Sequence, residues 1–161
     1  MNGEFAERFE SRNLDLICIL QPEPLLICAD SRRIWRVLEN LYVNVCKYAM
    51  PGTRVYVDAI KKDGKIQFSI KNISENPLNF QADELTERFI RGDVSRSTEG
   101  SGLGLSIAKN LTVLQHGSFN IYLDGDLFKV TITFDEAVKE KKPMPPMIVP
   151  EAVQEEAQQD A

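Results

Sequence analysis

Two pairs of apolar runs, each joined by a short turn that contains Asp and Gly, constrain the fold of this chain more than any other feature. The first pair spans 54–71 around Asp63-Gly64, and the second spans 119–134 around Asp124-Gly125-Asp126. Asp-Gly between runs rich in Val, Ile and Phe is typical of a β-hairpin, because both turn positions tolerate a positive φ. The chain is therefore predicted to contain an antiparallel sheet.

Helical patterns interrupt these strands at two places. A strand at 14–20 and a second short strand at 25–28 precede Asp30, which is a good N-cap for a helix running to about Met50. A second helix is expected at 103–116, with Gly117 as the left-handed residue after its end. The order of elements predicts an α/β (α+β) two-layer sandwich, a mixed and mainly antiparallel sheet backed by helices.

Composition limits the classes of function. The 161 residues suit one domain, and 19 Lys and Arg against 24 Asp and Glu give a net charge of −5 with no basic run. Nucleic acid is therefore not an expected partner. No apolar stretch approaches the ~20 residues that cross a bilayer, so this chain is expected to be cytoplasmic and not membrane-inserted. The residues after 135 hold four prolines and many charges, which predicts a disordered tail.

The cysteines do not form a recognisable metal or disulfide pattern. Cys18, Cys28 and Cys46 are odd in number and widely spaced, and the single histidine, His116, lies far from them in the sequence. The expected role of all three cysteines is that of small buried hydrophobic residues.

A polar stripe runs along the first long helix. Asn40, Asn44, Lys47 and Tyr48 stand at i, i+4, i+7 and i+8, and such a stripe is costly to bury against apolar packing. From spacing alone, a binding site and a solvated helix face are equally good interpretations.

A glycine-rich segment, EGSGLGLS at 99–106, ends a polar loop and opens the second helix. Glycines at every second position allow close approach of a ligand, and free N–H groups at a helix start favour phosphate. Taken alone, the segment could equally be a hinge without a ligand.

The polar stripe and the glycine-rich segment together indicate a family more specifically than either does alone. RVLENLYVNVCKY (36–48) followed by GSGLGLSIAK (100–109) resembles the N-box and G2-box of the ATP-binding domain of bacterial sensor histidine kinases, in the GHKL superfamily. ERFIRGD (87–93) resembles the F-box that starts the nucleotide lid. The resemblance implies a GHKL (Bergerat) ATP-binding fold in a catalytic domain at 14–135. It also implies a lead-in at 1–13 from an absent dimerisation domain, followed by the tail at 136–161.

The resemblance also assigns roles to individual residues. Asn44 would be the Mg²⁺ ligand, Asn40 would bind phosphate or metal-bound water, and Lys47 would place a cation on the phosphates. Arg91 would stabilise charge on the transferring phosphoryl group and, with Asn44 and Lys47, complete the catalytic set. The remaining residues assigned to ATP binding are Tyr48, Asn72, Arg96, Gly100, Ser101, Gly102, Leu103, Gly104 and Leu105.

One motif departs from the family. The G1-box, DxGxG, supplies an aspartate for the adenine amino group, but this chain has Asn72, with Ser74 and Asn76 in place of the glycines. The carbonyl oxygen of an Asn side chain can still accept a hydrogen bond from adenine, but it lacks the charge of an aspartate. A modest ATP affinity is therefore expected.

The implied activity is transfer of the ATP γ-phosphoryl group to a histidine. ATP-hydrolysing members of the superfamily carry a Glu where this chain has Asn40, and Glu39 is displaced by about 100° around the helix. This absence favours a protein-histidine kinase with ATP and Mg²⁺ as cofactors. His116 precedes a glycine at a helix end and is interpreted as structural, so the acceptor belongs to a separate dimerisation domain.

A response regulator would be the indirect partner, and the full-length protein would be anchored in the bacterial inner membrane. Two alternatives stay open. One is a degenerate GHKL module with weak nucleotide binding and a regulatory role, and the other is an ATPase or protein-serine kinase relative.

Overall fold

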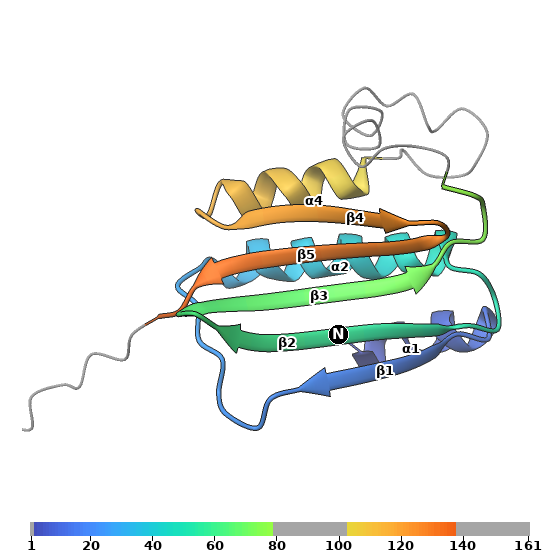
Figure 1. The fold of residues 1–161 in the computed structure, drawn as a ribbon, viewed down its shortest axis with the longest axis horizontal. Helices are drawn as coiled ribbons and strands as arrows, with labels where there is room; N and C mark the ends of the chain where they lie inside the picture. The colour runs from blue at the N-terminus through green and yellow to red at the C-terminus, as the bar shows by residue number, and fades with distance from the viewer. Residues whose placement is uncertain (1, 79–102, 138–161) are drawn as a thin grey trace, which may run out of the picture.

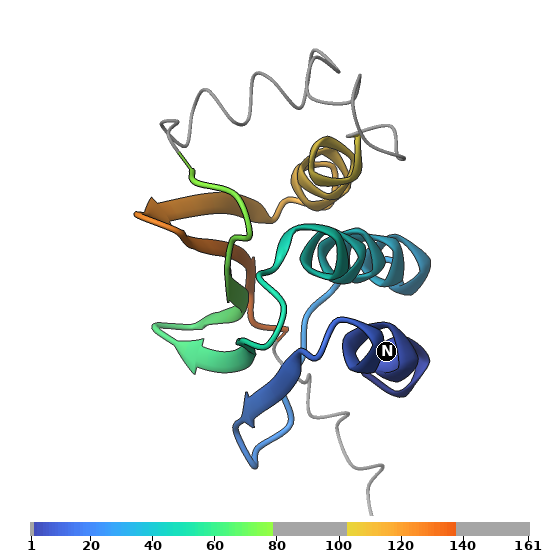
Figure 2. The ribbon, with the colours of Figure 1, turned by 90° about the vertical axis from the view of Figure 1, so that its right-hand side faces the viewer.

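A single sheet with helices on one face organises the chain (Figure 1, Figure 2). The structure is a computed structural model that describes residues 2–78 and 103–137. Within these ranges, five strands lie in the order β1-β2-β3-β5-β4, and all neighbours are antiparallel except β1 and β2. The strands are β1 (Asp15–Leu20), β2 (Arg54–Lys62), β3 (Lys65–Ile73), β4 (Ser118–Asp124) and β5 (Leu127–Asp135). The described helices are α1 (Asn2–Ser11), α2 (Ser31–Tyr48) and α4 (Gly104–Val113). The predicted mixed two-layer sandwich is confirmed.

Both hairpins form as the sequence predicts, with Asp63-Gly64 as the first turn and Gly125-Asp126 as the second. Asp63 and Gly64, between β2 and β3, have φ values of 51° and 71°. Positive φ at both turn positions matches the right-handed twist of the flanking strands. Gly125 has a φ of 55° in the turn between β4 and β5.

Helix α2 lies across the middle of the sheet (Figure 2). It begins after Asp30, whose side chain accepts a hydrogen bond from the Arg33 backbone N–H at 3.0 Å. Val37, Leu41 and Val45 are fully buried on its inner side. They pack over a core that includes Val57, Ile70, Val130 and Ile132 of the sheet. The opposite side of α2 is thereby left for polar residues.

Two expected elements differ from the structure. Residues 25–28 form no strand, and Ile27 makes only an isolated bridge to Glu136 at the end of β5. Helix α4 ends at Val113, three residues before the expected end. The left-handed residue beyond it is His116, with a φ of 63°, and not Gly117. Gly117 is needed for space, because a Cβ atom there would lie 2.6 Å from Cε1 of Phe134.

The prediction for the cysteines is wrong at two of the three positions. Cys18 and Cys28 are exposed, and Cys46 is half-buried. Cys18 lies on the edge strand β1 and Cys28 in the segment that fails to form a strand, so neither is enclosed by neighbouring elements. The helical turns expected at 83–89 and the tail beyond 137 lie outside the described residues.

Candidate functional site

The polar stripe of α2 and the glycine-rich start of α4 lie against each other. A Cβ atom on Gly104 would lie 3.2 Å from Oδ1 of Asn40. The Asn40 amide is oriented by its own Nδ2, which donates to the Arg36 carbonyl at 2.7 Å and leaves Oδ1 directed at α4. A side chain at position 104 would therefore press on the Asn40 amide. The two motifs, 64 residues apart in sequence, form one corner of the molecule.

The residues at this corner differ in exposure. Asn40, Asn44 and Tyr48 are half-buried, and Lys47 is exposed. Because α2 rises by about 1.5 Å per residue, this stripe extends ~12 Å from Asn40 to Tyr48. The first turn of α4 presents backbone N–H groups without partners in the helix, a property that favours anions.

The leucines of the glycine-rich motif face opposite ways. Leu103 is exposed at the start of α4, whereas the side chain of Leu105 is buried in the core. Leu105 can therefore offer a ligand only its backbone.

Asn72 is a buried polar residue on the helix-facing side of the sheet. It lies near the end of β3, opposite Phe128 of β5, and is 3% exposed. Its Nδ2 donates to the Ile73 carbonyl at 3.0 Å, while its buried Oδ1 has no hydrogen-bond partner among the described residues. A buried acceptor without a partner costs about 1–3 kcal/mol, so this oxygen is available to accept a hydrogen bond from a ligand.

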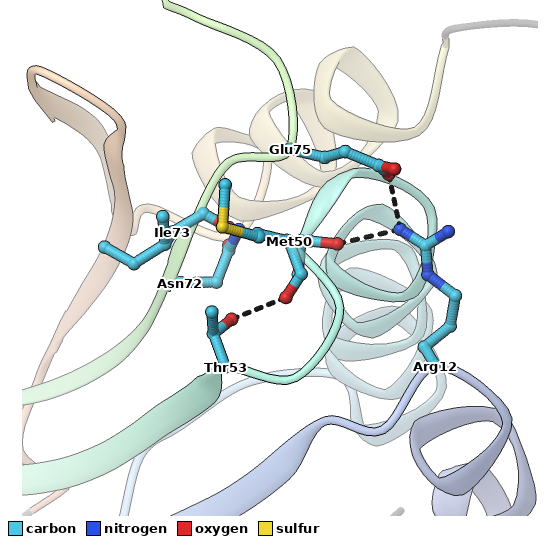
Figure 3. Close-up of polar contacts among 7 residues, drawn as sticks. Arg12, Met50, Thr53, Asn72, Ile73 and Glu75 are labelled. Atoms are coloured by element: carbon cyan, nitrogen blue, oxygen red, sulfur yellow. Dashed lines mark hydrogen bonds and ion pairs between the residues drawn. The ribbon is translucent and has the colours of Figure 1, made fainter.

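The end of α2 is joined to the end of β3. The Met50 N–H donates to the Ile73 carbonyl at 2.8 Å, and the Glu75 N–H donates to the Tyr48 carbonyl at 2.8 Å. Figure 3 shows Asn72 beside Met50 at this junction. The stripe on α2 and the buried amide on β3 therefore belong to one site, with Asn72 at the Tyr48 end and Gly104 at the Asn40 end.

Arg12 holds this junction from outside the predicted site. Its Nη2 donates to the Ala49 carbonyl at 2.8 Å and to Oε2 of Glu75 at 2.6 Å (Figure 3). Arg12 directly follows α1, so the N-terminal helix is tied to the segment after Asn72. No local sequence signal distinguishes Arg12, because both of its partners are distant in the chain.

Several predicted residues cannot be placed against this geometry. Arg91, Arg96, Gly100, Ser101 and Gly102 lie outside the described residues. His116 is exposed at the far end of α4, where its positive φ supports a structural role in ending the helix.

The amide side chains of α2 beside the start of α4 form a surface that suits an anionic ligand such as a phosphate group. Residues 29–138 match the family described as histidine kinase-, DNA gyrase B- and HSP90-like ATPase, and the chain belongs to this family. The chain is 32% identical over 117 residues to the signal transduction histidine-protein kinase BaeS of Escherichia coli, covering 71% of this chain and 25% of that protein. It is 31% identical over 113 residues to the heme sensor protein HssS of Staphylococcus aureus, covering 70% and 24%. The chain spans about a quarter of the length of these relatives.

Solved structures agree with the fold. The catalytic domain of histidine kinase ThkA superposes with a TM-score of 0.71 at 23% identity, covering 84% of this chain and 87% of that one. Acinetobacter baumannii histidine kinase AdeS gives a TM-score of 0.67 at 21% identity, covering 85% and 61%. The prediction of an ATP-binding catalytic domain of the sensor histidine kinase type is confirmed. Within the described residues, no helix is long and apolar enough to cross a membrane.

Proposed function

We propose that this chain binds Mg-ATP along α2 and passes the γ-phosphoryl group to a histidine on a dimerisation domain outside the chain. Adenine would lie at Asn72, and the phosphates would lie between Asn44, Asn40 and the start of α4. The observation that carries the proposal is the buried Oδ1 of Asn72, an acceptor without a partner among the described residues.

The orientation of the Asn72 amide favours adenine. Its Nδ2 is engaged by the Ile73 carbonyl, so the acceptor oxygen is the atom directed away from the strand end. The amino group of adenine can donate to this oxygen. Guanine carries a carbonyl oxygen at the same position, and two acceptors would face each other. This mismatch supports selection of ATP over GTP.

The amide oxygens of α2 suit a magnesium-bound triphosphate. Asn44 would supply one hard oxygen ligand to Mg²⁺, and the phosphates and waters would supply the rest. When bound, Mg²⁺ would neutralise charge on the phosphates. Lys47 would add a positive charge, and the first N–H groups of α4 would donate to phosphate oxygens. Arg91 and Arg96, with Gly100, Ser101 and Gly102, are assigned to the triphosphate by resemblance and lie outside the described residues.

The residue at position 40 favours transfer to a protein over hydrolysis. An amide cannot remove a proton from water, and Asn40 uses its Nδ2 to donate to the Arg36 carbonyl. Glu39 is exposed and faces another direction. A histidine of the partner domain would therefore be the acceptor, with a response regulator receiving the phosphoryl group afterwards.

Thermal unfolding with and without Mg-ATP and Mg-GTP tests the site. A ligand at 100 times its dissociation constant adds about 2.7 kcal/mol to the free energy of unfolding. We expect Mg-ATP to raise the Tm more than Mg-GTP, and the rise to be lost in Asn44→Ala and Asn72→Leu. Ser69→Ala is the matched control, because Ser69 also lies on β3 with a buried oxygen lacking a partner in the described part of the chain.

If no nucleotide at millimolar concentration shifts the Tm, the degenerate regulatory module becomes the better assignment. The transfer step has a separate test. The full-length protein, incubated with Mg-ATP, should acquire phosphate on a histidine in its dimerisation domain. Steady hydrolysis of ATP without a phosphorylated histidine would contradict the kinase assignment.

A further inference from the structure

The face of the sheet that points away from the helices is open. Helices α1, α2 and α4 all lie on one face, and no described helix lies on the other (Figure 2). Because side chains alternate along a strand, the buried Ile70 of β3 points toward the helices, while Ser69 and Lys71 point to the open face. The open face therefore carries the odd-numbered residues of β3, which are mostly polar.

One row of side chains crosses this open face from β1 to β4. Lys71 of β3 is opposite Tyr56 of β2 on one side and Lys129 of β5 on the other. Ile17 of β1 is opposite Tyr56, and Tyr122 of β4 is opposite Lys129, so the row spans all five described strands. Nζ of Lys71 lies 5.2 Å from the centre of the Tyr56 ring. These five residues are called the lysine row below.

The two lysines of this row face each other without a neighbouring anion. Side chains directly opposite on adjacent strands have Cβ atoms about 4.5–5.5 Å apart, and like charges at this distance are destabilising. Among the described residues neither Lys71 nor Lys129 forms an ion pair, and Asp58 in the next row forms none either. The lysine row is therefore a local positive site on a chain whose net charge is −5.

The size of the open face limits what can cover it. Five strands about 4.8 Å apart make the face ~20 Å wide, and the six residues of β1 make it ~20 Å long at that edge. Its area of ~400 Å² is about half of the ~800 Å² that each partner contributes to a stable interface. A short acidic segment therefore fits the lysine row better than a second folded copy does.

We propose that residues 150–161 dock on the lysine row of their own molecule. Their sequence, PEAVQEEAQQDA, contains four carboxylates and neither Lys nor Arg. Docking would place negative charge beside Lys71 and Lys129 and offset the repulsion between them. Residues 139–142, KEKK, carry the opposite charge, so the acidic part of this region is the part that complements the row.

The chain is long enough to return to its own sheet. Lys129 lies six residues before the end of β5 at Asp135, a distance of ~20 Å along the strand. Sixteen residues lead from Asp135 to Glu151, and an extended chain of this length spans up to ~53 Å. Attachment to the same molecule gives the segment an effective concentration in the millimolar range, so a few weak ion pairs suffice to hold it.

The inference is independent of the proposed ATP site. Asn72 lies on the helix-facing side of β3, whereas its neighbour Lys71 lies on the open face. Docking on the lysine row therefore needs no nucleotide and blocks no residue assigned to one.

Nuclear magnetic resonance of the whole chain tests this docking. The backbone amide shifts of Glu155 and Glu156 would be compared with those of a synthetic peptide of residues 150–161. We expect the two sets of shifts to differ at low salt and to coincide at about 1 M salt, where the Debye length falls to ~3 Å. Shifts equal to those of the free peptide at low salt would overturn the proposal.

Charge variants test where the segment docks. Lys71→Gln combined with Lys129→Gln should return the shifts of the segment to the free-peptide values. Lys62→Gln combined with Lys65→Gln is the matched control, because these two lysines also face each other on adjacent strands. Lys65 already pairs with Asp135 at 2.6 Å, so this control should leave the shifts unchanged. An equal loss in both double variants would mean unspecific attraction, contrary to the proposal.

Dilution separates docking within one molecule from docking on a second copy. Docking within one molecule is independent of protein concentration, so the shifts should stay constant on about tenfold dilution. Shifts that move toward the free-peptide values would mean that the segment occupies another molecule, which would contradict the proposal. None of these measurements uses nucleotide, so their failure is distinct from failure of the proposed ATP site.

Discussion

The backbone of Gly104 lies so close to Asn40 that a Cβ atom at position 104 would stand 3.2 Å from the Asn40 Oδ1. This spacing is tight but not prohibitive, so the consequence of a side chain depends on whether the amide can move. The Asn40 Nδ2 is already held by the Arg36 carbonyl at 2.7 Å, which limits that movement. The start of α4 and the stripe of α2 therefore act as one surface.

We expect Gly104→Ala to weaken Mg-ATP binding by about tenfold, or ~1.4 kcal/mol, because the methyl group displaces the Asn40 amide or the first N–H groups of α4. Calorimetric titration of Mg-ATP measures the change. Gly3→Ala is the control, since Gly3 also lies near the start of a helix and a Cβ atom there meets nothing within 4 Å. Binding equal in both variants would show that the close approach has no role in the site.

Arg12 is expected to stabilise the junction that carries Asn72. Arg12→Ala removes the charged donor to the Ala49 carbonyl and should lower the free energy of unfolding by about 1–2 kcal/mol, measured by urea denaturation. Glu75→Ala should cost less, below about 1 kcal/mol, because the ion pair is substantially exposed.

Comparing the two single variants separates the contribution of the ion pair from that of the hydrogen bond to the Ala49 carbonyl. If Glu75→Ala costs as much as Arg12→Ala, the ion pair and not the bond to the backbone dominates.

The elements most predictable from the sequence are those set by neighbouring residues. Asp63-Gly64 has its own positive φ values, and Asp30 caps α2 through a residue three positions away. Segment 25–28 shows the limit of this reasoning. Its apolar residues predict a strand, but whether a strand forms depends on a partner far along the chain, and here only Ile27 finds one.

His116 adopts a left-handed conformation that favours glycine. A non-glycine residue there costs about 1–2 kcal/mol, so His116→Gly should raise the free energy of unfolding by about 1 kcal/mol in urea denaturation. Gly117→Ala should lower it by about 1–3 kcal/mol, because the added methyl group would overlap Phe134. A gain in stability from Gly117→Ala would contradict the packing described at the end of α4.

The residues of the candidate site also differ in how far the sequence alone predicts their positions. Asn40, Asn44 and Tyr48 lie on one helix, so their spacing alone places them together. Asn72 is one of several polar residues in β3, and only the resemblance to a family motif indicated its role. Arg12 could not be found, because its partners lie 37 and 63 residues away and the contact exists only after the sheet and α2 have assembled.

The cap of α2 should make stability depend on pH. The backbone N–H of Arg33 donates to Asp30 and holds the pKa of this carboxyl below its ordinary value of 3.8. A carboxyl whose pKa is lowered by folding stabilises the fold fully above its unfolded-state pKa, and this contribution is lost as pH falls through the lower folded-state value. Asp30→Asn keeps a capping oxygen but cannot titrate.

The urea midpoints of both proteins, measured from about pH 6 down to about pH 2, should therefore converge or cross below the ordinary Asp pKa. Other carboxyl groups titrate equally in the two chains, so the difference between the midpoints isolates Asp30. A difference that stays constant over the whole range would show that the cap acts through its geometry and not through its charge.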